Sequence, residues 1–323
     1  MDTVFLETTG DRHLQVVGGV TALERKIREA AKQGAKRVVV AAEPVALPRP
    51  MAIAVEFVAA GTPSPVDARR ERADVIAGIE LIDEQARKQA EWKLIRGMNK
   101  SFEGPVDALI NWRFSMRLTR LLARCSLRVT PNHVTVIAIL VGLSAALLAG
   151  QGGYVAVAVA GVMLECNSIL DSVDGELARL RFQYSKLGQW LDNLSDDIVD
   201  NVFLVGVGIG LGGIWLWLGI VSAAGRVVVS ALTYLDVYRR TGTGDVFAFR
   251  WWFEIDKQSA DEVYDPKALS TWLRSFGRRD TYVFLWMVAC VCGFPYWVIG
   301  HGAVIAAVNV TMIVAHFTLV RRP

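Results

Sequence analysis

Four aspartates in residues 171–196 are the residues of this chain best suited to chemistry. They are Asp171, Asp174, Asp192 and Asp196, and apolar runs precede and follow them. An ionised carboxylate is costly in apolar surroundings unless a cation or a shared proton compensates it. The stretch therefore indicates a functional site, and the question is which of the two compensates the charge.

The spacing of the aspartates favours a cation. Asp171 and Asp174 are three residues apart, and Asp192 and Asp196 are four apart, so each pair shares one face of a helix. Two such faces turned toward each other would form a cage of oxygen atoms, which suits Mg²⁺, Mn²⁺ or Ca²⁺. The alternative is that the carboxylates cap helices or pair with nearby basic residues, namely Arg179, Arg181 and Lys186.

The stretch also resembles the signature of the CDP-alcohol phosphotransferase (CDP-alcohol phosphatidyltransferase) family, D-x2-D-G-x2-A-R-x8-G-x3-D-x3-D. The matching residues are Asp171, Asp174, Gly175, Ala178, Arg179, Gly188, Asp192 and Asp196. Eight fixed residues at fixed gaps make this a specific pattern. This spacing favours the functional site over the alternative of capping or paired carboxylates.

The resemblance implies a reaction in which an acceptor alcohol attacks the β-phosphorus of a CDP-alcohol, releasing CMP and leaving a phosphodiester. It implies that Asp171, Asp174 and Asp192 hold Mg²⁺ or Mn²⁺. Asp196 would complete the metal cage and accept the proton of the acceptor as general base.

The resemblance assigns the remaining signature positions to the nucleotide. Gly175 and Gly188 would let the backbone approach it closely. Ala178 and Arg179 complete this group, with Arg179 able to neutralise a phosphate or pair with an aspartate. Members of the family are often homodimers, so a homodimer is expected.

Composition predicts a membrane protein with a water-exposed N-terminal part. The chain has 323 residues, of which 53% are hydrophobic, and the long apolar runs lie beyond residue 130. We expect about six transmembrane helices in one bundle. Their predicted ranges are 133–149, 154–172, 191–212, 214–234, 282–299 and 303–320.

The Lys and Arg residues between these spans predict the orientation. They gather beside the acidic stretch, in the insertion 237–280 and at the C-terminus, whereas the opposite loops contain none. The signature and the N-terminal domain are therefore expected at the cytoplasmic face of the inner membrane, in contact with lipid. The start of the chain does not resemble a signal peptide, no basic tract interleaved with aromatic residues suggests nucleic acid, and no role is assigned to 237–280.

Residues 1–99 are expected to form a small α/β domain. A helix is predicted at 21–33 and a buried strand at 37–42. The run Gly18–Arg25 resembles part of a sugar-phosphate nucleotidyltransferase domain. The glycine-rich, lysine-containing loop that would hold a nucleoside triphosphate is absent, so the domain is predicted to be non-catalytic. The alternative is an unrelated α/β cap.

Residues 100–130 are expected to link this domain to the membrane domain, 131–323. Arg113, Arg117, Arg120 and Arg124 share one helical face, which predicts an amphipathic helix lying in the membrane interface. A helix packed on the α/β domain is the alternative. The sequence before this helix resembles the linker of bifunctional enzymes that join an inositol-phosphate cytidylyltransferase to a di-myo-inositol-phosphate-phosphate synthase. This subgroup suggests CDP-inositol as donor and inositol phosphate as a polar acceptor.

Three further residues are candidates for the site. Asn132 follows Thr130-Pro131, which by itself reads as a helix cap, and the family also carries Pro-Asn here, near the nucleotide. Arg226 lies isolated in an apolar run, and Arg279 lies at the mouth of the predicted fifth span. Either arginine could bind the phosphate of the acceptor. Pairing of Arg226 with Glu165 or a signature aspartate, and membrane anchoring by Arg279, are the alternatives.

Three other functions remain open at this point. A phospholipid synthase would use CDP-diacylglycerol with inositol phosphate, glycerol phosphate or serine. A six-span cation transporter would use the aspartates as an ion site, but would not release CMP. A pseudoenzyme scaffold would not be expected to keep all four aspartates.

Overall fold

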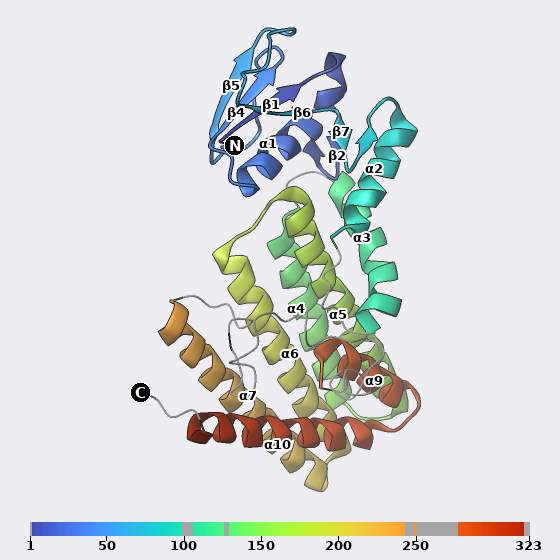
Figure 1. The fold of residues 1–323 in the computed structure, drawn as a ribbon. Coiled ribbons are helices and arrows are strands. Elements are labelled where there is room, and N and C mark those ends of the chain that lie inside the picture. Colours follow the sequence, from blue (N-terminus) through green and yellow to red (C-terminus); the bar gives the residue numbers. More distant parts are fainter. Residues whose placement is uncertain (1, 99–105, 126–128, 243–248, 250–276, 320–323) are drawn as a thin grey trace. The chain divides into compact units, whose positions relative to one another are not determined.

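The structure is a computed structural model that describes residues 2–98, 106–125, 129–242, 249 and 277–319 (Figure 1). The chain forms two compact units. The first comprises Met1–Asn99, Met116–Val129 and Glu176–Gln183. The second comprises Lys100–Ser115, Thr130–Gly175 and Tyr184–Pro323. Part of the acidic signature stretch thus belongs to the same unit as the N-terminal residues.

The first unit is built on a parallel four-stranded sheet with the order β5-β4-β1-β6. The strands are β1 (Thr3–Glu7), β4 (Arg37–Ala41), β5 (Ala54–Val58) and β6 (Arg69–Arg72). Helix α1 (Ala22–Lys32) connects β1 to β4 and packs Leu23 and Ile27 into one core with Val38 and Val40. The predicted α/β region is confirmed.

Shorter elements complete this unit. They are the 3-10 helix η1 (Gly10–Leu14), β2 (Val16–Val17), β3 (Val20–Thr21), β7 (Val75–Ile76), β8 (Ile79–Glu80) and α2 (Glu84–Arg96). Strands β2 and β3 form a hairpin whose turn, Gly18-Gly19, has φ values of +61° and +79°. Glycine adopts such angles without steric cost. The Thr21 hydroxyl then accepts a hydrogen bond from the Glu24 N–H at 3.2 Å and caps α1.

Helix α3 (Trp112–Arg124) carries the four arginines that predicted an amphipathic helix. Arg120 and Arg124 contact the buried carboxylate of Glu91 on α2, at 2.8 and 2.9 Å. Arg113 and Arg117 are exposed, as are Phe114 and Leu121. The C-terminal part of α3 therefore packs on the α/β unit, as the alternative interpretation proposed. The exposed apolar and basic side chains of α3 are compatible with contact to a membrane surface, so its interfacial location stays a prediction.

The second unit is helical. It contains the π-helical turn η2 (Asp107–Asn111), α4 (Pro131–Gly150), α5 (Tyr154–Arg181) up to Gly175, α6 (Lys186–Leu211), α7 (Gly213–Thr241), α9 (Arg279–Val291) and α10 (Pro295–Leu319). Among the described residues, α4, α5, α7 and α10 are long and apolar enough to cross a membrane. They indicate a membrane protein. The part of the 237–280 insertion between 243 and 276 lies outside the described residues, apart from residue 249.

The predicted span 282–299 is wrong as a single helix. Helix α9 ends at Val291, Gly293 has a φ of +79°, and α10 begins at Pro295. A left-handed glycine ends a helix readily, and proline is favoured in the first turn of the next one. The apolar composition of this region concealed the break, because hydropathy does not report backbone geometry.

Glycines hold α6 close to α4. A Cβ atom on Gly206 would lie 2.3 Å from the Ala146 carbonyl oxygen, and one on Gly210 would lie 2.3 Å from that of Ala149. Neither position can accept a side chain without moving a helix backbone. Small residues permit such close packing of membrane helices, and here they fix the helix that carries Asp192 and Asp196.

We predict that Glu91→Gln destabilises the first unit by about 2 kcal/mol, because two arginines lose a buried anionic partner. Burial raises the pKa of Glu91, but its hydrogen bonds to Arg120 and Arg124 outweigh this and hold the pKa below its ordinary value of 4.5. The ion pair therefore stabilises the fold above about pH 4.5, and the stabilisation is lost as the pH falls through the lowered pKa. Thermal unfolding of the full chain measures this. Glu84→Gln is the control, because Glu84 is an exposed acid of α2 that pairs with Arg87; an equal effect of both changes would contradict the prediction.

Candidate functional site

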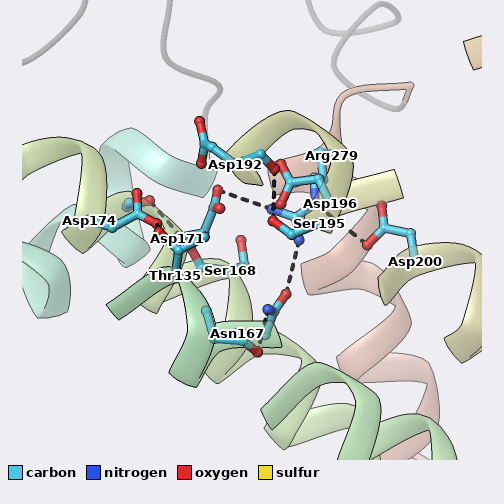
Figure 2. A network of polar contacts seen from close by, with 12 residues as sticks. Thr135, Asn167, Ser168, Asp171, Asp174, Asp192, Ser195, Asp196, Asp200 and Arg279 are labelled. Atoms are coloured by element: carbon cyan, nitrogen blue, oxygen red, sulfur yellow. Dashed lines mark hydrogen bonds and ion pairs between the residues drawn. The ribbon is translucent and has the colours of Figure 1, made fainter. Parts of the chain in front are cut away.

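Three carboxylates of the acidic stretch converge in the second unit. Carboxylate oxygens of Asp171 and Asp174, from α5, and Asp192, from α6, all lie within 4.8 Å of one another (Figure 2). The sequence predicted two helical faces turned toward each other, and the structure brings three of the four predicted ligands together. Oxygen donors in this arrangement suit a hard divalent cation such as Mg²⁺ or Mn²⁺.

Asp174 is the most enclosed of the three ligands. It is 5% exposed and accepts a hydrogen bond from the Thr135 hydroxyl of α4. Asp171 and Asp192 are only half-buried. One ligand is therefore fixed by a neighbouring helix, whereas the other two face a region that a ligand could reach.

Arg279, the first residue of α9, lies among the carboxylates (Figure 2). Its Nη1 is 2.8 Å from Asp196 Oδ1 and 3.2 Å from Asp171 Oδ2. Its Nη2 donates to Asn167 Oδ1 at 2.9 Å, and Asn167 in turn donates to the Ala138 carbonyl oxygen. The predicted candidate Arg279 is thus part of the site and joins α5 to α6.

Asp196 differs from the other three signature aspartates in its contacts. It pairs with Arg279 and does not belong to the group of three oxygens that could hold a metal. It lies one helical turn beyond Asp192 on α6. The arrangement separates a candidate metal centre from a fourth carboxylate beside it.

Asn132 and Gly188 lie together where α4 and α6 begin. A Cβ atom on Gly188 would be 2.9 Å from Asn132 Oδ1 and 2.8 Å from Ser185 Oγ. The Gly188 N–H donates to that serine hydroxyl at 2.8 Å, which caps α6. Glycine is therefore required here for close approach, and Asn132 is brought to the start of the second signature helix.

The other signature residues lie on α5. Gly175 follows Asp174 directly, and Ala178 and Arg179 lie in the last turns of the helix, in the segment assigned to the first unit. All three are half-buried. Among the described residues, the buried Nε of Arg179 has no hydrogen-bond partner.

Arg226 is paired, but with a residue that the sequence analysis did not consider. Arg226 of α7 is 3.3 Å from Asp200 Oδ2 and donates to the Tyr282 hydroxyl at 2.8 Å. Its guanidinium also lies over the rings of Tyr282 and Trp286. The partner is neither Glu165 nor a signature aspartate, and nothing in these contacts supports phosphate binding by Arg226.

Asp200 is the residue of this site that sequence analysis missed. It is 1% exposed in its side chain, accepts a hydrogen bond from Tyr282, and lies 3.5 Å from Arg279 Nε as well as beside Arg226. Its spacing was a usable signal, because Asp192, Asp196 and Asp200 recur every four residues on one face of α6. The signature pattern ends at Asp196 and so does not include Asp200.

The charges of the cluster do not balance. Five aspartates (Asp171, Asp174, Asp192, Asp196 and Asp200) face two arginines (Arg226 and Arg279). If all are ionised, these seven residues carry three more negative than positive charges. The donor set and the charge both fit a divalent cation.

Comparison with known proteins finds the family that the signature stretch resembles. Residues 128–256 match the family model for CDP-alcohol phosphatidyltransferase. A "Bifunctional IPC transferase and DIPP synthase" of Aquifex aeolicus is 30% identical over 213 residues, which are 65% of this chain and 42% of the relative. A protein of the same name from Thermococcus kodakarensis is 36% identical over 149 residues, 45% of this chain and 33% of the relative.

A third relative has a different name. The "Archaetidylinositol phosphate synthase" of Pyrococcus horikoshii is 38% identical over 93 residues, 28% of this chain and 46% of the relative. The aligned regions span less than half the length of each of these three relatives.

We predict that Asp171→Asn and Asp174→Asn each weaken binding of Mn²⁺ by at least about tenfold, because each removes a charged oxygen ligand. Titration of the purified full-length protein with Mn²⁺, followed by electron paramagnetic resonance, measures this. Asp236→Asn is the matched control, since Asp236 is a buried aspartate of α7 that pairs with Arg240 outside the cluster. Unchanged affinity in both cluster variants would rule out the metal centre.

Proposed function

Because residues 128–256 match the family model for CDP-alcohol phosphatidyltransferase, we propose that this protein transfers a substituted phosphoryl group from a CDP-alcohol to an acceptor alcohol. The acceptor oxygen forms a bond to the β-phosphorus, the bond from that phosphorus to CMP breaks, and a phosphodiester results. The observation that carries the proposal is the convergence of Asp171, Asp174 and Asp192 beside Arg279.

We assign a separate role in this reaction to each group of site residues. Asp171, Asp174 and Asp192 would hold Mg²⁺ or Mn²⁺, which would neutralise the diphosphate and make CMP a better leaving group. Gly188 leaves room beside Asn132 for close approach of the nucleotide. Gly175, Ala178 and Arg179, on α5, are the other proposed nucleotide contacts. Arg279 offers a planar set of N–H donors that can bind the phosphate of an acceptor.

Asp196 is the proposed general base. It lies outside the three ligand oxygens, and the 2.8 Å contact with Arg279 fixes the direction of its carboxylate. It would take the proton of the acceptor hydroxyl as the new oxygen–phosphorus bond forms. The earlier assignment of Asp196 as a fourth metal ligand remains a secondary part of the proposal.

For substrates, we favour CDP-inositol as donor and inositol phosphate as acceptor. Two relatives are named for IPC transferase and DIPP synthase activities, and the candidate phosphate-binding residue Arg279 fits a phosphorylated acceptor. The second candidate is a lipid donor such as CDP-diacylglycerol with inositol phosphate. The relative named archaetidylinositol phosphate synthase favours it. Under either reading, residues 1–99 are not expected to transfer cytidylyl groups.

We also propose the membrane arrangement. Helices α6 and α9 join the four apolar helices in one bundle of six in the inner membrane, with α9 reaching only part of the way. Its 13 residues extend about 20 Å, compared with about 30 Å of hydrocarbon. The distribution of basic residues supports a cytoplasmic location for the signature and the N-terminal unit. A homodimer is the proposed assembly.

The function is tested with the purified full-length protein, Mg²⁺ or Mn²⁺, and a panel of CDP-alcohols crossed with acceptors. Mass spectrometry should detect CMP and a phosphodiester in equal amounts for at least one pair, and only with metal present. The identity of the pair separates a polar donor from a lipid donor. A transporter would give no CMP with any pair, and that result would end the proposal.

Asp196→Asn should separate binding from chemistry. We expect the variant to keep metal-dependent CDP binding within about threefold, because its carboxylate is not among the three ligands, while the rate falls by on the order of 10²–10⁴. Calorimetric titration and turnover of the same preparation measure the two effects. If Asp196→Asn loses nucleotide binding as fully as Asp171→Asn, then Asp196 acts as a ligand and the base lies elsewhere.

A further inference from the structure

The C-terminal end of α5 is packed within the first unit. Residues Glu176–Gln183 belong to this unit, although α5 runs as one helix from Tyr154 to Arg181 and carries Asp171 and Asp174. The signature residues Ala178 and Arg179 lie inside this segment. Whatever holds the segment therefore acts on the helix that provides two of the three metal ligands.

Arg25 of α1 makes the central contact with this segment. Its Nη2 donates to the carbonyl oxygen of Leu180 at 2.8 Å and to that of Val17 at 3.0 Å. The residue is 1% exposed, and its guanidinium also lies over the Phe182 ring, 5.2 Å from the centroid. Burial lowers the pKa of Arg25 to about 10, which leaves it charged at neutral pH. The last carbonyls of a helix lack partners within the helix, and a cation there is stabilising.

The turn Gly18-Gly19 lies against the same segment. A Cβ atom on Gly18 would be 2.7 Å from Leu180 Cδ1, and one on Gly19 would be 2.8 Å from Arg181 Nε and from the Ala123 carbonyl oxygen. These glycines belong to the run that resembles a nucleotidyltransferase. In this structure the absence of side chains at both glycines lets the end of α5 pack closely against the turn. This packing is a role for the run Gly18–Arg25 other than nucleotide binding.

Two further side chains bond the segment to α3 and to the residues that follow it. Arg181 is fully buried and donates to the carbonyl oxygens of Leu122, Ala123, Cys125 and Val129. The Thr119 hydroxyl donates to Glu176 Oε2 at 2.6 Å. Phe182, directly after the helix, has a φ of +54°, an angle that costs a non-glycine residue free energy. The surrounding contacts must therefore hold the chain in this turn.

We propose that the N-terminal α/β unit is a positioning part of the phosphotransferase, with Gly18, Gly19 and Arg25 forming a socket for residues 180–182. The socket fixes the end of α5, and so the register and direction of Asp171, Asp174 and Arg179. This inference rests on the proposed function for its consequence for catalysis, but not for its consequence for structure. Arg25 is a positioning residue that acts through the backbone of α5.

The test compares Arg25→Ala with Arg28→Ala in the full-length protein. Arg28 is also on α1, and it pairs with Glu24, which keeps Arg49 as a partner when Arg28 is removed. Hydrogen exchange measured by mass spectrometry should become faster at 176–183 in Arg25→Ala while strands β1 and β4 stay protected. Turnover should fall by on the order of 10- to 100-fold, as expected when reacting groups are misplaced by about 1 Å. Arg28→Ala should change neither quantity more than about twofold.

Two further variants keep the test decisive if Arg25→Ala fails to fold. Arg25→Lys retains the charge but not the planar fork, so turnover should lie between the wild type and the alanine variant. Gly19→Ala is compared with Gly34→Ala. Both positions have positive φ, but nothing lies within 4 Å of a Cβ on Gly34. Only Gly19→Ala should therefore speed exchange at 176–183 and reduce turnover.

The outcomes separate the two proposals. Normal exchange at 176–183 and normal turnover in folded Arg25→Ala and Gly19→Ala would overturn the socket. Faster exchange over the whole first unit with unchanged turnover would also overturn it, since that result describes a residue that only stabilises the fold. If the wild type releases no CMP from any CDP-alcohol, the proposed function fails, and the exchange data still decide whether the socket exists.

Discussion

The accumulation of negative charge in an apolar helical unit is the constraint on which the rest of this structure depends. Asp171, Asp174 and Asp192 bring their oxygens together, and Asp196 and Asp200 follow on α6. Water compensates such charges at a surface, but among packed helices the compensation must come from nearby cations or from bound protons. Arg279 pairs with Asp171 and Asp196, and the three converging carboxylate oxygens suit a metal ion as a further cation.

This division gives the site two parts with different chemistry. The converging oxygens of Asp171, Asp174 and Asp192 suit a hard cation. Beside them, Arg279 pairs with Asp196 and with Asp171. Asp200 contacts Arg279 and forms an ion pair with Arg226, and the Tyr282 hydroxyl is hydrogen-bonded to both Asp200 and Arg226. These contacts support the position of Arg279.

Helix α5 connects this chemistry to the N-terminal unit. The same helix carries two metal ligands in one unit and the Leu180 carbonyl that accepts from Arg25 in the other. A helix transmits a displacement along its axis because its backbone hydrogen bonds link every turn to the next. An α/β unit that lacks a recognisable triphosphate-binding loop can therefore still contribute to the site by fixing the end of this helix.

The sequence by itself determined the signature, its closely spaced carboxylates, the small α/β region and the presence of apolar helices. Each of these depends on local spacing or composition, which a single sequence contains. Only the tertiary structure decided which groups meet. It paired Arg226 with Asp200, placed Arg279 between α5 and α6, made Thr3–Glu7 one of the two inner strands of the sheet, and broke the predicted fifth span at Gly293. It also assigned residues 176–183 to the N-terminal unit. These outcomes depend on contacts between residues far apart in the chain, where the packing of many side chains, and not the pattern of any one segment, sets the lowest free energy.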